Sequence, residues 1–268
     1  GLRCDMPEAR AYYDSIFRMY AEWGVDFVKC DDIAREYPHC KREIEVISDA
    51  CRACRRDIVL SLSPGPAPLE QAEHLKKYAN MWRITDDFWD EWRLLKGMFE
   101  RAEKWCVHAA PGHWPDADML PVGALRQCYD PNGWTNFTQA EQRTMMTLWC
   151  MMRSPLMMGG ELTKNDDFTL KLLTNRDVLA IEKTSACAHP LWTTEDESAW
   201  IAPRRDGKGL YAALFNLSEE TRTVRVTGEM LEGTYSAARE LWTGEKRQTA
   251  DGVTATLGKH DAAVFWVE

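Results

Sequence analysis

Apolar and polar positions follow two alternating patterns along the first two thirds of the chain. Short apolar runs typical of buried strands occupy residues 25–29, 58–62 and 81–84. Stretches between them carry apolar residues three or four positions apart, as on one face of a helix. These helical stretches span residues 8–22, 41–56, 69–78 and 89–105. Repeated strand-then-helix units predict a parallel sheet with right-handed crossovers.

The alternation continues less regularly to about residue 185. Residues 118–120 and 155–159 are short strand candidates, and residues 166–183 have a helical pattern. Thr138, with Glu141 three residues later, forms a capping box that predicts a helix to about Met152. No glycine-rich phosphate-binding loop follows any strand, so a barrel is favoured over a nucleotide-binding open sheet.

A different pattern begins near residue 197. Apolar or alternating runs are separated by turn residues such as Asp206-Gly207 and Thr243-Gly244. The runs cover residues 199–201, 210–215, 223–226, 236–241 and 262–267. This pattern predicts a small antiparallel β-sandwich. We place the boundary between residues 185 and 196, which gives an α/β domain at 1–190 and a β-sandwich domain at 191–268.

Charge and composition narrow the range of partners. The formal net charge is −9 over 268 residues, which argues against a nucleic-acid partner because phosphate binding needs clustered Lys and Arg. No run of 18 apolar residues is present, so no membrane span is expected. The nine cysteines lack zinc-ligand spacing, and scattered unpaired thiols favour a reducing, cytoplasmic compartment. The oligomeric state is not indicated.

Carboxylates cluster where the predicted strands end. Asp31 follows the first strand, Asp87 follows the third, and Asp118 lies in the short candidate strand. In a strand-helix barrel the active site lies at the carboxyl ends of the strands, and a buried carboxylate needs a partner or a function. The other interpretation is helix capping, because Asp is a favoured N-cap. It applies best to three neighbouring residues, Asp32, Asp86 and Asp116.

Two of these carboxylates have different predicted environments. Lys29 shares a strand face with Asp31 and should hold its carboxylate ionised. Asp87 has Asp86 beside it and three aromatic residues within the next five positions, which should favour its protonated form. An ionised nucleophile and a protonated acid are the two groups that retaining glycoside hydrolysis requires, at a separation of about 5–7 Å.

A metal site is the alternative use of the same residues. Asp31, Asp87 and Asp118 could serve as oxygen ligands to a divalent cation. The positive charge of Lys29 argues against this interpretation because it would repel a metal ion. We therefore expect no metal and no cofactor.

Five ordered motifs resemble glycoside hydrolase family 27, the group of alpha-galactosidases and alpha-N-acetylgalactosaminidases. WGVDFVKCD at 23–31 is similar to the family's W-G-x-D-x-x-K-x-D segment, and WRITDDF at 82–88 is similar to W-R-x-x-x-D. GHWPDADML at 112–120 is similar to G-x-W-x-D-P-D-M-L. SPLM at 154–157 and NRDVLAI at 175–181 match two later family segments.

This resemblance implies a retaining exo-glycosidase that cleaves terminal alpha-linked galactose by double displacement. Asp31 would be the nucleophile and Asp87 the acid/base. Five further residues would line the sugar-binding subsite: Lys29, Ser63, Arg83, Asp118 and Met119. The implied substrate is an alpha-galactoside or an alpha-N-acetylgalactosaminide, and no cofactor is implied.

Some positions depart from the family pattern. Cys30 replaces an aromatic residue, and Asp86 replaces a glycine. Ser63 stands where the family's N-acetylgalactosaminidases carry serine, and Gly65 and Ala67 near it favour a roomier pocket for the substituent at C2. Alpha-N-acetylgalactosaminidase activity is therefore the alternative function.

The resemblance also predicts which part of the barrel is present. The family barrel has eight strands, and its nucleophile ends the fourth. Since the sequence starts one helix before that strand, we expect a partial (β/α)8 TIM barrel of about strands 4–8, followed by the β-sandwich. Such a piece would be a fragment of a longer protein or be completed by a second chain. An inactive carbohydrate-binding fragment is accordingly the third interpretation.

Overall fold

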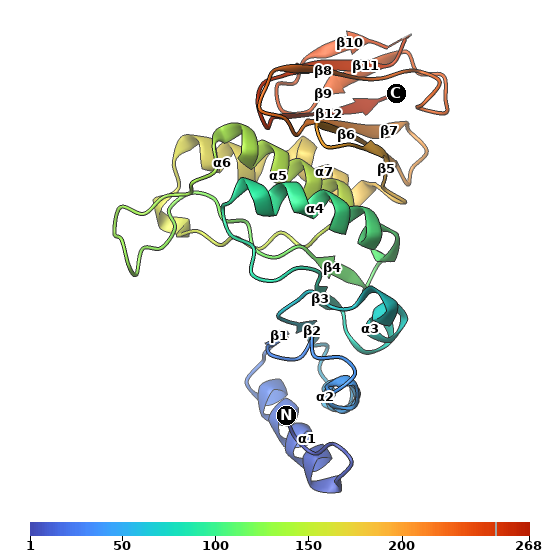
Figure 1. Ribbon diagram of the computed structural model, residues 1–268. Coiled ribbons are helices and arrows are strands. Elements are labelled where there is room, and N and C mark those ends of the chain that lie inside the picture. Colours follow the sequence, from blue (N-terminus) through green and yellow to red (C-terminus); the bar gives the residue numbers. More distant parts are fainter. Residues whose placement is uncertain (250) are drawn as a thin grey trace. The chain divides into compact units, whose positions relative to one another are not determined.

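The computed structural model describes residues 1–249 and 251–268. The chain forms two compact units (Figure 1). The first consists of Gly1–Asp87 with His108–Asp118, and the second consists of Phe88–Val107 with Met119–Glu268.

The first unit is built on a four-stranded parallel sheet with the order β1-β2-β3-β4. Its strands are β1 (Phe27–Cys30), β2 (Val59–Leu62), β3 (Met81–Arg83) and β4 (Trp114–Asp116). Its helices are α1 (Pro7–Glu22), α2 (Lys41–Ala53), the short 3-10 helix η1 (Leu69–Gln71) and α3 (Ala72–Tyr78). The predicted strand-then-helix order and parallel pairing are confirmed.

Burial of alternate apolar residues explains this arrangement. Ile44, Ile47 and Cys51 face inward from α2, at the spacing of a helical stripe. Leu62 and Trp82 are fully buried in neighbouring strands of the sheet. The carboxyl ends of β1, β2 and β3 therefore lie side by side, and the loops that follow them carry the predicted site residues.

Two predicted strands are displaced or reduced. The strand expected at 118–120 lies instead at Trp114–Asp116. Asp118 has φ 78°, a left-handed conformation that cannot continue a strand. The strand expected at 155–159 is reduced to one parallel bridge between Met158 and Leu120.

The second unit begins with helices. They are α4 (Trp92–Trp105), α5 (Gln139–Met152), η3 (Leu162–Lys164), α6 (Asp167–Thr174) and α7 (Arg176–Thr184), and a short helix η2 (Cys106–His108) follows α4. The capping box predicted for α5 is confirmed, because Thr138 accepts from the Glu141 N–H and the Glu141 carboxylate accepts from the Thr138 N–H. The helix predicted at 166–183 is interrupted at Asn175, whose side chain caps α7.

A β-sandwich completes the second unit. One sheet has the order β10-β9-β12-β7-β6-β5, and the other pairs β11 with β8. The strands are β5 (His189–Thr193), β6 (Glu197–Pro203), β7 (Leu210–Asn216), β8 (Arg222–Val226), β9 (Ala237–Glu240), β10 (Lys246–Gln248), β11 (Val253–Leu257) and β12 (Ala262–Val267). The five predicted strands are present, whereas β5, β10 and β11 were missed. The predicted boundary at 190 falls inside β5 and stays a prediction.

Apolar side chains from both sheets of the sandwich form one core. Helix α5 packs against β12, β6 and β7 on the outside of the larger sheet. The core contains Ala199, Ile201, Leu210, Ala212, Leu214, Val224, Val226, Leu231, Ala238, Val253, Ala255, Leu257, Ala263, Phe265 and Val267. In the part of the chain that the structure describes, no helix combines the length and apolarity needed to cross a membrane.

Candidate active site

Asp31 follows directly after β1, and its carboxylate is held by the loop after β2. The Ser63 hydroxyl donates a hydrogen bond to Asp31 Oδ1 at 2.5 Å. Ser63 is only 1% exposed, whereas Asp31 is exposed. The structure thus brings together the predicted nucleophile and a predicted sugar-binding residue.

The hydrogen bond from Ser63 is the largest influence that lowers the pKa of Asp31 below its usual range. The backbone N–H of Asp32 and the charges of Lys29 and Arg83 act in the same direction. An ionised Asp31 was predicted from Lys29 alone. The structure corrects the cause, because a hydroxyl in direct contact outweighs a charge on an exposed lysine.

Arg83 links two further predicted site residues. Its side chain leaves the end of β3 and is buried, with Nη1 2.8 Å from Asp118 Oδ1 and Nη2 3.3 Å from Asp87 Oδ1. The Asp118 side chain is 9% exposed and the Asp87 side chain 69%. Since the buried pair is also the shorter one, Asp118 provides most of the compensation for the Arg83 charge, and Asp87 remains open to solvent.

The three aromatic residues expected around Asp87 follow it in the sequence and belong to the second unit. The Asp87 carboxylate is mostly exposed and lies beside the Arg83 guanidinium. Asp86, the expected like-charged neighbour, forms an ion pair with Arg35 at 3.1 Å. The apolar setting of Asp87 stays a prediction.

The capping interpretation for the neighbouring aspartates is wrong. The helices that follow have Cys40, Glu91 and Thr138 as their N-cap residues. Asp86 instead accepts a hydrogen bond from the Asp87 N–H at 2.9 Å. Asp32 adopts φ 56°, which turns the chain sharply after Asp31.

Asp116 is a buried support that sequence reasoning missed. Its Oδ1 accepts from the Asp118 N–H at 2.9 Å, and burial raises the pKa of Asp116 to about 6. This contact holds the left-handed turn that presents the Asp118 side chain to Arg83. The only sequence signal was the D-x-D spacing of Asp116 and Asp118.

Gly65, near which a roomier pocket is predicted, packs closely against the end of β3. Gly65 is buried, and a Cβ there would lie 2.3 Å from the Thr85 carbonyl oxygen and 2.5 Å from that of Arg83. Ala67 donates its N–H to the Arg83 carbonyl oxygen at 2.9 Å. The absence of a side chain at Gly65 therefore allows this loop to pack closely on β3.

Met119 belongs to the second unit, where it contacts Gly159: a Cβ on that glycine would lie 2.6 Å from the Met119 sulfur. Lys29 lies on β1 with an exposed side chain. The separation of the Asp31 and Asp87 carboxyl groups stays a prediction. The described residues include no group of three His, Cys, Asp or Glu side chains placed to hold a metal ion.

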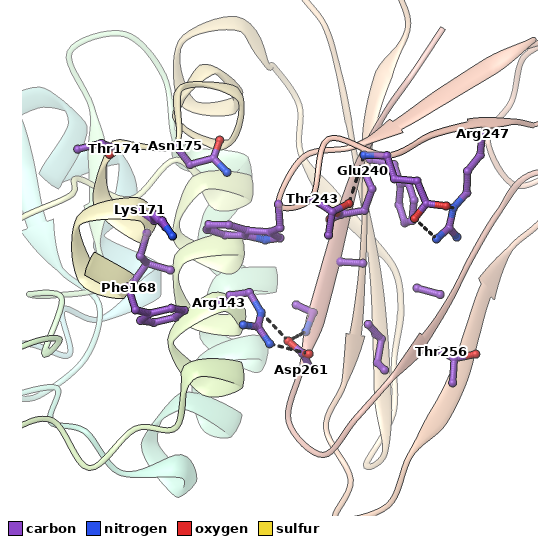
Figure 2. Close-up of a pocket in the computed structure, with 18 residues that line it drawn as sticks. Arg143, Phe168, Lys171, Thr174, Asn175, Glu240, Thr243, Arg247, Thr256 and Asp261 are labelled. Atoms are coloured by element: carbon purple, nitrogen blue, oxygen red, sulfur yellow. Dashed lines mark hydrogen bonds and ion pairs between the residues drawn. The ribbon is translucent and has the colours of Figure 1, made fainter. Parts of the chain in front are cut away.

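A separate cavity of about 680 Å³ lies wholly within the second unit (Figure 2). It opens between α5, α6 and the sandwich, and its lining includes Arg143, Lys171, Glu240 and Trp242. The Arg143 guanidinium and the Asp261 carboxylate form an ion pair in its wall. None of the predicted site residues lines this cavity.

Both regions of the chain match known protein families. Residues 3–184 match the alpha galactosidase A family, and residues 191–267 match the alpha galactosidase C-terminal beta sandwich domain. A curated relative, the alpha-galactosidase of Cyamopsis tetragonoloba, is 27% identical over 266 residues, which cover 97% of this chain and 62% of the relative.

Two solved structures of bacterial proteins have higher identity to this chain. A GH27 β-L-arabinopyranosidase from Geobacillus stearothermophilus is 44% identical with a TM-score of 0.95, covering 100% of this chain and 63% of that one. A candidate alpha-N-acetylgalactosaminidase from Bacillus halodurans is 41% identical with a TM-score of 0.85, covering 100% and 64%. The chain thus spans less than two thirds of the length of these relatives. Its match to the catalytic family over the larger part of its length, together with the match to that family's C-terminal domain, shows that the chain belongs to glycoside hydrolase family 27, the alpha-galactosidase family.

Proposed function

We propose that this chain supplies the catalytic carboxylates of a retaining exo-glycosidase that acts on galacto-configured pyranosides. Asp31 is the nucleophile and Asp87 the acid/base. The observation that carries the proposal is the Asp31 carboxylate at the end of β1, held by Ser63 at 2.5 Å with its pKa lowered. A carboxylate that stays ionised and oriented is suited to attack an anomeric carbon.

Two displacements complete the reaction. In the first, an Asp31 oxygen bonds to the anomeric carbon while the bond to the leaving oxygen breaks and Asp87 gives that oxygen a proton. In the second, Asp87 takes a proton from water, the water oxygen bonds to the anomeric carbon, and the ester to Asp31 breaks. Exposure of Asp87 suits this role, because its carboxyl must meet both the leaving group and water.

Arg83 and Asp118 form the fixed part of the proposed subsite. Their ion pair is almost fully buried, with side-chain exposures of 3% and 9%. Charged groups held in this way can donate and accept hydrogen bonds at sugar hydroxyls without reorganising. Lys29 and Met119 remain proposed sugar contacts on the strength of their motifs.

The substrate best supported is a β-L-arabinopyranoside. The relative with that activity is 44% identical over the whole chain, whereas a curated alpha-galactosidase is 27% identical. The two sugars share their configuration at C1 to C4 and differ by the hydroxymethyl group at C5, so one pair of carboxylates can serve either. An alpha-galactoside, the substrate predicted from the sequence, is the second candidate.

Nitrophenyl glycosides separate these substrates. The intact protein should show its highest kcat/KM with the β-L-arabinopyranoside, a lower value with the alpha-galactoside, and the lowest with the 2-acetamido-alpha-galactoside. A reversed order of the first two would assign the protein as an alpha-galactosidase. Preference for the 2-acetamido sugar would favour the N-acetylgalactosaminidase alternative.

The role of Asp31 is tested by substitution. Asp31→Ala in the intact protein should lower kcat by at least about 1,000-fold, because the covalent step is lost. Added azide should restore turnover and yield a glycosyl azide of inverted configuration. Asp32→Asn is the matched control: it changes the adjacent exposed carboxyl to a residue that tolerates φ 56°, and activity should persist. Retained activity in Asp31→Ala would remove Asp31 from the mechanism.

A further inference from the structure

The Ser63 hydroxyl is committed to Asp31 and has little surface left for a ligand. It has one hydrogen to donate, and that hydrogen points to Asp31 Oδ1 at 2.5 Å. A hydroxyl-to-carboxylate bond of this length is typical of the strong, charge-assisted kind. Ser63 is 1% exposed. Because its single hydrogen is already donated, the hydroxyl cannot donate to a sugar without releasing Asp31.

The backbone of Ser63 also holds the segment that carries Asp31. Its N–H donates to the carbonyl oxygen of Cys30 at 2.8 Å. Its own carbonyl oxygen accepts from the N–H groups of Ile33 and Ala34 at 3.0 and 3.4 Å. Ser63 is therefore hydrogen-bonded to the backbone on both sides of Asp31, and its hydroxyl also holds the Asp31 side chain.

These hydrogen bonds of Ser63 matter because few other contacts constrain Asp31 and Asp32. Asp31 and Asp32 are exposed, and Asp32 adopts an uncommon left-handed conformation. An exposed carboxylate on such a turn would sample several rotamers, of which few point at a reacting carbon. Displacement reactions depend steeply on the alignment of the attacking group.

The loop after Ser63 has little freedom to release it. Gly65 packs against the carbonyl oxygens of Arg83 and Thr85, and Ala67 is hydrogen-bonded to Arg83. The position of the Ser63 hydroxyl is thus determined by the end of β3 as well as by β2. Because this loop packs on β3, that strand also fixes the position of Ser63 next to Asp31.

We propose that Ser63 is a positioning residue, which orients the Asp31 carboxylate for attack rather than binding the sugar. This inference rests on the proposed function of Asp31 and changes the role that its family motif suggested for Ser63. It predicts that loss of the hydroxyl slows attack on every substrate alike, whatever stands at C2.

Strand β2 offers a matched control. Ser61 lies in β2, two positions before Ser63, which directly follows the strand. Ser61 is also fully buried, but its hydroxyl has no hydrogen-bond partner among the described residues. Ser61→Ala and Ser63→Ala therefore remove the same buried atom, and only the second removes a contact with Asp31. Ser63→Thr restores a hydroxyl.

The first measurement is covalent labelling of the intact protein by a galacto-configured cyclitol epoxide. A carboxylate opens the epoxide, so an ester forms while a ring C–O bond breaks and the alkoxide takes a proton from the acid/base. Peptide mass spectrometry should find the label on Asp31. Ser63→Ala should label about 10- to 100-fold more slowly, with Ser61→Ala unchanged and Ser63→Thr partly restored.

The second measurement compares glycosides with and without the 2-hydroxyl group. Ser63→Ala should lower kcat/KM by the same factor for both, and the acidic limb of its pH profile should move up by about 1 pH unit. A loss confined to the 2-hydroxy substrate, with the limb unmoved, would show a sugar-binding role and overturn the inference. Unchanged labelling of Asp31 in Ser63→Ala would also overturn it. Label on a different residue in the unmodified protein would instead refute the proposed function.

Discussion

Buried acidic side chains in this chain are stabilised by different neighbours. Asp90 is 2% exposed and is held by the Arg126 guanidinium and by the N–H of Asn136 at 2.5 Å. Asp118 is held by Arg83. Glu182 on α7 differs, because its Oε1 is buried without a hydrogen-bond partner in the described part of the chain. Burial raises the pKa of Glu182 to about 8.

This makes the stability of the second unit depend on pH. The folded-state pKa of Glu182 lies above its ordinary 4.5, so the folded form binds the proton more tightly. Stability should therefore fall as pH rises from about 4.5 to about 8 and stay low above that range. Glu182→Gln removes this dependence, because the amide carries no charge at any of these pH values.

Urea unfolding at pH 5 and pH 9 tests this prediction. Glu182→Gln should stabilise the protein by ~2 kcal/mol more at pH 9 than at pH 5, allowing for partial solvation of the side chain. Glu195→Gln, at an exposed position, should show no such difference. An equal effect of Glu182→Gln at the two pH values would show that this carboxyl is already well solvated.

At the scale of elements, the loop after β2 is held in place by close packing of Gly65 against the end of β3. Gly65→Ala would place a methyl group 2.3 Å from the Thr85 carbonyl oxygen, and backbone cannot give way cheaply. We expect a loss of about 3 kcal/mol or more in the free energy of unfolding, together with loss of activity through displacement of Ser63.

Gly97, inside α4, provides the contrast. A Cβ there meets only the end of the Arg101 side chain, at 3.4 Å. Gly97→Ala should stabilise the protein by about 0.5–1 kcal/mol, because alanine loses less backbone entropy in a helix. Thermal unfolding of the two variants measures both changes in stability. A Gly65→Ala protein as stable as the unmodified one would mean that the loop can move away from β3.

At the scale of the whole chain, the helices of the second unit and the β-sandwich belong to one compact unit. The connection is made by charged and aromatic groups. His260, 3% exposed, lies between the carboxylates of Glu141 and Glu219 and stacks on Trp92 at 3.5 Å between ring centres. Beside it, Arg143 of α5 donates two hydrogen bonds to Asp261, at 3.0 and 2.8 Å.

A double-mutant cycle measures this connection. Arg143→Met and Asp261→Asn should show a coupling energy of ~1 kcal/mol, since the pair is bidentate and its side chains are only 27% and 22% exposed. The pair Arg93–Glu91, 78% and 57% exposed, should give a coupling near zero. Equal coupling in the two cycles would indicate that burial of the Arg143 pair adds nothing.

The sequence alone determined the order of those elements that have a clear local periodicity. Strand-helix alternation predicted β1 to β3 and their helices, the Thr138 capping box predicted the start of α5, and turn residues marked the sandwich strands. The same pattern placed Asp31, Asp87 and Asp118 at the ends of predicted strands. Parallel strands bring these ends to one edge of the sheet.

Only the tertiary structure decided what each of these side chains contacts. Partners such as Ser63 for Asp31 and Arg83 for Asp118 lie 32 and 35 positions apart in the sequence, at or just after the ends of different strands. The strength of a charge interaction depends on distance and burial, which periodicity does not encode. For that reason the sequence indicates Lys29 and not Ser63 as the main influence on Asp31, and it does not show that Gly65 packs against the backbone at the end of β3.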